Sequence, residues 1–155
     1  MKIQWKKLII ALGIPLGVGG LSALLTRGAM EDFSATQQPP LSPPSWLFPV
    51  VWTILFLLMG VASYLVYTSG KPTRAKTALT VYGIQLGFNF LWSILFFNLQ
   101  AYLFAFLWLI ALWALIIITA VLFYNIRPAS GYLLIPYILW VTFAGYLNVG
   151  IYLLN

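Results

Sequence analysis

Five long apolar runs, none of which contains a charged residue, constrain this chain more than any other feature. They cover residues 8–25, 47–67, 78–97, 102–124 and 132–154. About 20 helical residues cross the roughly 30 Å hydrocarbon core of a bilayer. Inside lipid only helices and closed barrels satisfy their backbone hydrogen bonds, and these runs lack the strict alternation of barrel strands. The sequence therefore predicts an all-α integral membrane protein, with residues 1–155 forming a single bundle of five transmembrane helices.

The composition supports a membrane protein and excludes several kinds of chemistry. Only 6% of the residues are charged, whereas soluble domains average about 25%. The chain has no His and no Cys, so it lacks an imidazole base, a thiolate nucleophile and the commonest zinc ligands. Its only acidic side chains, Glu31 and Asp32, are neighbours in sequence. We therefore expect no metal site, no resident cofactor and no conventional acid–base catalysis.

The distribution of basic residues predicts how the chain crosses the membrane. With five spans, the N-terminus and the segments 68–77 and 125–131 lie on the same side of the bilayer. That side carries seven of the eight basic residues: Lys2, Lys6, Lys7, Lys71, Arg74, Lys76 and Arg127. Basic loops favour the cytoplasmic side, so we expect a cytoplasmic N-terminus and a C-terminus outside the cell membrane. Because these residues flank apolar runs and form no stripe, nucleic acid is not an expected partner.

The longest connection, residues 26–45, is polar and rich in proline. Pro39, Pro40, Pro43 and Pro44 have fixed φ angles and no N–H donor, which predicts a largely extended course over residues 37–44. Two interpretations remain open: a stiff connector, or a lid over one end of the bundle, since loops longer than about 12 residues are often functional.

The third run has two different faces. Gln85, Asn89 and Trp92 follow helical i, i+4, i+7 spacing, so they share one face, which we expect to point into the bundle. Gly83 and Gly87 lie on the opposite face and permit close approach of a neighbouring helix or a second subunit. We expect this glycine face to be the seam of a homodimer. The two amides either line a binding site or act only as hydrogen-bonding contacts between helices.

The first run contains a similar pair of glycines. Gly13 and Gly17 are four residues apart, a spacing that allows tight contact with another helix. Such pairs are common in membrane helices, so this signal is weak.

Aromatic side chains in two other runs add to the amide face. Trp52 and Phe56 lie in the second run, and one face of the fifth run carries Trp140, Phe143, Ala144, Leu147 and Asn148. Together with the third run they predict an aromatic-walled cavity with a few amide donors, the composition of a small-molecule site. Taken singly, each aromatic residue is also explained by packing or by anchoring at the membrane interface.

Three ordered motifs cover most of the chain. The first contains Pro43-Pro44, Pro49, Val51-Trp52-Thr53 and Met59-Gly60, the second Gln85-Leu86-x₂-Asn89-x₂-Trp92-Ser93-x₂-Phe96-Phe97, and the third Pro136-Tyr137-x₂-Trp140-x₂-Phe143-Ala144-x₂-Leu147-Asn148. Their order in a five-span chain of this length resembles the tryptophan-rich sensory protein/translocator protein family (TspO/MBR, the peripheral-type benzodiazepine receptor).

The resemblance implies a five-helix bundle, often a homodimer, that binds porphyrins, sterols and synthetic ligands such as isoquinoline carboxamides and benzodiazepines. It implies a ligand pocket between the helices beneath the first loop, where Phe33, Pro43 and Pro44 are the candidate lid residues. The family's ligand-contact positions match Trp52, Phe56, Asn89, Trp92, Trp140, Phe143, Ala144 and Leu147. To these, the polar face patterns add Gln85 and Asn148. Bacterial members are implicated in tetrapyrrole-linked stress regulation, and some promote light-driven porphyrin breakdown using tryptophans that match Trp52 and Trp140.

The chain departs from the family pattern in two places. In the first loop, Gln38 and Leu41 stand where the family usually has a lysine and a tryptophan. At the C-terminus, Val149 and Leu153 replace the tyrosine and arginine of the animal members' cholesterol motif. High-affinity cholesterol binding is therefore not expected.

Three functions are consistent with these features. The first is a membrane receptor, sensor or transporter-like protein that binds protoporphyrin IX and other flat apolar ligands, because such rings stack on aromatic walls. A metal-free porphyrin is the better ligand, since without His or Cys strong axial ligation of haem iron is not expected. The second is a light-dependent porphyrin-degrading photo-oxidase, in which the excited porphyrin supplies the reactivity and Trp52 and Trp140 are the catalytic residues. The third is a non-catalytic membrane scaffold.

Overall fold

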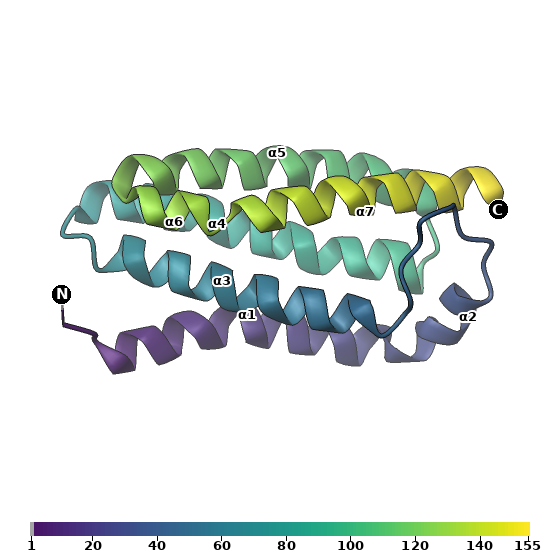
Figure 1. The fold of residues 1–155 in the computed structure, drawn as a ribbon, viewed down its shortest axis with the longest axis horizontal. Coiled ribbons are helices and arrows are strands. Elements are labelled where there is room, and N and C mark those ends of the chain that lie inside the picture. Colours follow the sequence, from purple (N-terminus) through teal and green to yellow (C-terminus); the bar gives the residue numbers. More distant parts are fainter. Residues whose placement is uncertain (1) are drawn as a thin grey trace.

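The computed structural model describes residues 2–155, which form helices and connecting loops without a strand. The elements are α1 (Trp5–Thr26), η1 (Arg27–Ala29), α2 (Met30–Ser34), α3 (Leu47–Tyr67), α4 (Pro72–Ser93), η2 (Ile94–Asn98), α5 (Tyr102–Ile126), α6 (Pro128–Tyr132) and α7 (Ile135–Leu154). The long helices lie side by side in one bundle (Figure 1).

Five segments of the described chain are long and apolar enough to cross a membrane. They are Trp5–Ser34, Leu47–Tyr67, Pro72–Asn98, Tyr102–Ile126 and Pro128–Leu154. The predicted five-helix bundle is confirmed, and the chain is a multi-pass membrane protein. The third helix begins at Pro72 rather than at residue 78, because α4 extends beyond its apolar run into a basic first turn. The last segment is divided into α6 and α7, and Pro136 falls in the first turn of α7, where its missing N–H costs no helical hydrogen bond.

The long helices pack in an order that differs from their order along the chain. α1 lies against α3, α4 against α5, and α5 against α7. Two glycines allow the close approach of α1 and α3. An added Cβ at Gly60 of α3 would lie only 2.8 Å from the Cα of Leu12 in α1, and an added Cβ at Gly19 of α1 would overlap the ring of Phe56 in α3. Gly13 and Gly17 of α1, in contrast, have open space around them. The tight contacts between α1 and α3 are therefore made at Gly60 and Gly19.

The end of α4 widens into a short π-helical segment, η2. The N–H of Leu99 donates to the carbonyl of Ile94, five residues earlier, over 3.0 Å. Two consecutive residues of this segment, Phe96 and Phe97, contact the same ring, that of Phe33 in α2, with centroid distances of 5.7 and 5.1 Å. The segment therefore builds an aromatic anchor for the start of the long loop. Such π-helical insertions are frequent at functional sites.

The loop after α2 crosses to the C-terminal end of α7 (Figure 1), where hydrogen bonds hold it in place. Its course is irregular at residues 37–39 and 42–44, as expected of the proline-rich stretch, but a turn interrupts it at residues 40–41. Backbone and side-chain groups of Gln37 and Asn155 exchange two hydrogen bonds of 3.2 and 2.9 Å. Tyr146 donates to the carbonyl of Pro40, and the ring of Pro39 leaves no room for a side chain at Gly150.

Candidate ligand-binding site

Side chains from α4 and α7 meet at the hydroxyl group of Tyr137 in α7. The side-chain N–H of Asn89 donates to this hydroxyl over 2.6 Å, and the hydroxyl donates to Oε1 of Gln85 over 2.7 Å. All three residues are buried, Gln85 and Tyr137 with only 1% of their surface exposed. The two amides of α4 are thus joined through a single group of another helix.

Two tryptophans lie next to this hydrogen-bonded group: Trp52 of α3 contacts the ring of Tyr137, and Trp140 is one helical turn after Tyr137 on α7. Trp52 stacks on Phe56 with ring centroids 5.6 Å apart, and it meets the ring of Tyr137 edge-on at 6.2 Å. Trp140 meets Phe48 edge-on at 5.9 Å. We call the following set the inner cluster: Trp52 and Phe56 of α3, Gln85 and Asn89 of α4, and Tyr137 and Trp140 of α7. Trp52 and Trp140 are half-buried, so they form its accessible edge.

Two polar groups of the inner cluster have no hydrogen-bond partner. They are Nε2 of Gln85 and Nε1 of Trp140, and both atoms are buried. The hydroxyl of Tyr82, one helical turn before Gln85, is a third such atom. An unsatisfied buried polar group costs about 1–3 kcal/mol. Because the amide and indole groups of Gln85 and Trp140 are donors, an acceptor atom brought to them would be stabilised.

A second hydrogen-bonded group ties three helices together next to the cluster. Nε1 of Trp92 donates to Oδ1 of Asn148 over 3.1 Å, and Nδ2 of Asn148 donates to the carbonyl of Tyr102 over 2.8 Å. Trp92 and Asn148 were both expected to contact ligand. In the structure their polar groups bond to one another and to α5, and the contact of these two residues with a ligand stays a prediction.

The remaining candidate residues of α7 continue the aromatic surface. Phe143 is half-buried and contacts Trp140 at 5.6 Å. Ala144 and Leu147 are buried. Ala144 lies one helical turn after Trp140, and its small side chain takes up little space between the neighbouring rings on this face of α7.

The candidate lid residues lie at different depths. Phe33 is buried and meets Phe48 edge-on at 6.2 Å, and Phe48 in turn contacts Trp140. Pro43 is half-buried and Pro44 is exposed, and both precede the first turn of α3. Phe33 is thus the lid residue in contact with the aromatic surface that leads to the inner cluster.

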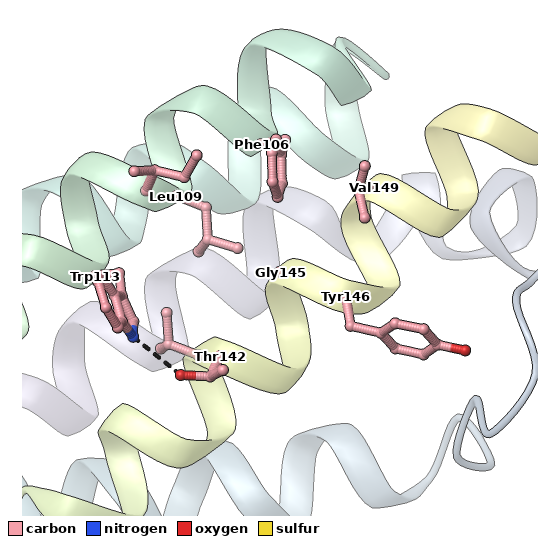
Figure 2. Close-up of a pocket in the computed structure, with 9 residues that line it drawn as sticks. Phe106, Leu109, Trp113, Thr142, Gly145, Tyr146 and Val149 are labelled. Atoms are coloured by element: carbon pink, nitrogen blue, oxygen red, sulfur yellow. Dashed lines mark hydrogen bonds between the residues drawn. The ribbon is translucent and has the colours of Figure 1, made fainter.

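A separate apolar hollow of about 280 Å³ lies between α5 and α7. Its lining residues are Phe106, Leu109, Ile110, Trp113, Val141, Thr142, Gly145, Tyr146 and Val149. Figure 2 shows the indole N–H of Trp113 bonded to the hydroxyl of Thr142 across the hollow, at 2.9 Å, while Tyr146 points away from α5. The indole N–H of Trp113 is already bonded to Thr142, so it is not available to a ligand in the hollow. Several of the lining residues are exposed at the outer surface of the bundle. It therefore orients polar ligands less well than the inner cluster.

Comparisons with known proteins show the family of the chain. Residues 11–154 match the model of the TspO/MBR family. The chain belongs to the TspO/MBR family. It is 38% identical to tryptophan-rich protein TspO of Archaeoglobus fulgidus, over 96% of this chain and 97% of that protein. It is 36% identical to the protein of the same name from Chlorobaculum tepidum, over 100% and 99%, and 33% identical to translocator protein of Bos taurus, over 84% and 79%.

In this TspO/MBR chain the two glycines of the expected seam are on the outer surface. Gly83 and Gly87 are exposed, with open space where a Cβ would be, whereas Gln85 and Asn89 on the same helix are buried. The helix therefore presents the two faces expected from the spacing of these residues.

Sequence patterns missed two residues of the site. Tyr137 was noted only as part of a family motif, although it holds both amides. Phe48, in the first turn of α3, was not singled out from the sequence, although it joins Phe33 to Trp140. The i, i+4 relation of Phe48 to Trp52 on α3 was the available signal for Phe48, whereas the pairing of Tyr137 with α4 left no periodic signal.

Proposed function

We propose that this TspO/MBR protein is a membrane receptor, or a transporter-like sensor, that binds porphyrins and other flat apolar ligands at the inner cluster. One observation carries the proposal: two buried donors without partners, on Gln85 and Trp140, lie among aromatic rings. Aromatic walls favour a flat, apolar guest. The free donors favour a guest that also carries acceptor atoms at its edge, such as the propionate groups of protoporphyrin IX. The porphyrin is a ligand in this proposal, not a resident cofactor.

Binding requires movement of the accessible rings. The rings of Trp52, Phe56 and Tyr137 contact one another, as do those of Phe48 and Trp140. A ligand must therefore displace at least one of them to reach Gln85. Trp52 and Trp140 are the half-buried members, so their side chains are the ones we expect to turn.

Quenching of tryptophan fluorescence by protoporphyrin IX tests the proposal. We expect saturable quenching of the reconstituted protein and clearly weaker affinity for Trp52→Phe and Trp140→Phe, because each loses indole contact area. Trp113→Phe is the matched control, since it changes an indole of the outer hollow and should leave the affinity unchanged. Linear, non-saturating quenching that is equal in all four proteins would contradict binding at the inner cluster and favour the scaffold.

A light-dependent photo-oxidase is the alternative at the same site. It is favoured by the position of Trp52 and Trp140, which are both accessible and both in ring contact with the rest of the site. In this alternative, illumination of the bound porphyrin under oxygen bleaches its absorbance, and Trp140→Phe slows the bleaching more than it weakens binding. Bleaching at the same rate with Trp140→Phe, at equal occupancy, argues against a role of this indole in the reaction.

We further propose that the protein lies in the cell membrane with its N-terminus in the cytoplasm. The support is the collection of seven basic residues at one end of the bundle. The absence of cysteine from the sequence makes a direct test simple. In intact cells, Leu41→Cys in the long loop should react with a membrane-impermeant maleimide, and Ser69→Cys between α3 and α4 should react only after lysis. The reverse pattern would contradict this orientation.

A further inference from the structure

The two ends of the bundle differ in charge. The N-terminus, the turn between α3 and α4, and α6 lie at one end, and the long loop and C-terminus lie at the other (Figure 1). Seven basic residues belong to the first end, whereas the only acidic side chains of the sequence, Glu31 and Asp32, are in α2 at the second. The carboxylate side chains of this chain therefore lie too far from the basic end to neutralise its charge.

Cations from three segments are brought together at this end. Nζ of Lys71, just before α4, donates to the last helical carbonyl of α5, that of Ile126, over 3.4 Å. The next residue, Arg127, donates to the carbonyl of Leu65 in α3 over 3.5 Å. Nζ of Lys7 in α1 lies 5.5 Å from the centroid of the Tyr67 ring at the end of α3. These contacts hold the three cations in place. The partners of Lys7 and Lys71, a ring and a carbonyl group, are neutral and do not compensate the charge of these two side chains.

The start of α4 adds further positive potential. No side chain caps this helix, and its first turn contains no acidic residue but does contain Arg74. The N-terminus of a helix carries a partial positive charge and has free backbone N–H groups, both of which favour an anion. The 22-residue α4 opens directly beside Lys71. We call Lys7, Lys71, Arg74 and Arg127 the basic corner.

We propose that the basic corner binds the phosphate headgroup of an anionic phospholipid from the leaflet on the N-terminal side. The occupant is a lipid because the corner lies where apolar spans end. Trp5 and Tyr67, 64% and 60% exposed, flank it with the amphipathic rings that occupy the headgroup level of a bilayer. A lipid phosphate there meets the cations while its acyl chains lie along α1 and α3. Basic pockets between transmembrane helices bind anionic headgroups in this way.

Electron spin resonance of spin-labelled lipids tests the proposal on the full chain in phosphatidylcholine vesicles. The measurement is the fraction of spin-labelled phosphatidylglycerol held at the protein surface, relative to spin-labelled phosphatidylcholine. We expect a clear preference for phosphatidylglycerol that falls by about twofold to fivefold in Lys71→Gln/Arg74→Gln. Arg27→Gln, which removes one charge at the opposite end, should leave the preference unchanged.

A variant on the same side separates a built site from diffuse charge. Lys2 lies before α1 and outside the basic corner, so Lys2→Gln should lower the preference much less than Lys71→Gln. Wild-type protein in 1 M salt, where the screening length is only about 3 Å, should lose most of the preference without any risk to folding. Equal affinity of the wild type for both lipids, or equal losses with Lys2→Gln and Lys71→Gln, would overturn the proposal.

Discussion

At the residue scale, the hydroxyl of Tyr137 decides which atoms of the two α4 amides remain free. A tyrosine hydroxyl can accept one hydrogen bond and donate one, and here it accepts from Asn89 and donates to Gln85. This arrangement uses Oε1 of Gln85 and leaves its Nε2 as the free donor. Tyr137 is therefore a positioning residue in the proposed site, since it fixes the amides through which a ligand would be recognised.

Removal of this hydroxyl tests its role. We expect Tyr137→Phe to lower the free energy of unfolding by about 2 kcal/mol. The substitution removes the hydroxyl that pairs with Nδ2 of Asn89 and Oε1 of Gln85, so both of these buried atoms lose their hydrogen bond. The midpoint of thermal unfolding in detergent measures the effect. Tyr152→Phe on the same helix removes an exposed hydroxyl and should shift the midpoint little. Equal midpoints for Tyr137→Phe and the wild type would show that the hydroxyl contributes no net stability.

The sequence could predict which polar residues of α4 are buried, but not what they bond. Helical spacing alone placed Gln85 and Asn89 on an inner face, and both are buried. Their partner lies about 50 residues away on another helix, and no periodicity connects the two. For the same reason the sequence did not predict that the polar groups of Trp92 and Asn148 bond to each other. Pairings between helices depend on the relative rotation and depth of the helices, which a single sequence does not encode locally.

At the element scale, α1 is the least buried of the five spans, and it meets α3 closely at two glycines, Gly19 and Gly60. Only 6% of its most apolar window is buried inside the protein, and its backbone meets α3 at Gly60. Without a hydrophobic driving force between helices in lipid, such close van der Waals packing is a main source of association. Gly13 and Gly17 face open space, so the weak signal of this pair did not identify the close contacts of α1, which are made at Gly19 and Gly60.

A single methyl group should loosen this contact. We expect Gly60→Ala to destabilise the protein by about 1–3 kcal/mol, because its Cβ would lie 2.8 Å from the Leu12 Cα and 3.0 Å from the Ala11 carbonyl oxygen. Gly13→Ala is the matched control: its Cβ meets nothing within 4 Å, and alanine favours the helix by about 1 kcal/mol. Thermal unfolding of both variants compares them. A lower midpoint for Gly13→Ala than for Gly60→Ala would contradict the assigned contact.

At the scale of the whole molecule, hydropathy predicted the number of spans and their approximate positions, but not the start of α4 or the order in which the helices pack. α5 is the clearest case, since it lies against both α4 and α7 and yet is apolar on every side. A helix that is apolar all round has no stripe to mark its neighbours. Three regions follow one another along the bundle: the long loop bound to α7 at one end, the inner cluster, and the basic corner at the other end.

The outer face of α4 provides the last test, because we propose that two copies of the bundle associate there. Gly83 and Gly87 are surrounded by open space in one copy, so a larger side chain can be added without disturbing the fold, and it would block the close helix contact that glycines permit. We expect Gly87→Leu to convert a dimer into a monomer, as measured by light scattering in detergent, while the thermal midpoint of the monomer is retained. Gly17→Leu on α1 is the matched control. Gly17 is four residues after another glycine, Gly13, as Gly87 is after Gly83, and it also has open space around it. Dissociation by Gly17→Leu but not by Gly87→Leu would move the seam from α4 to α1.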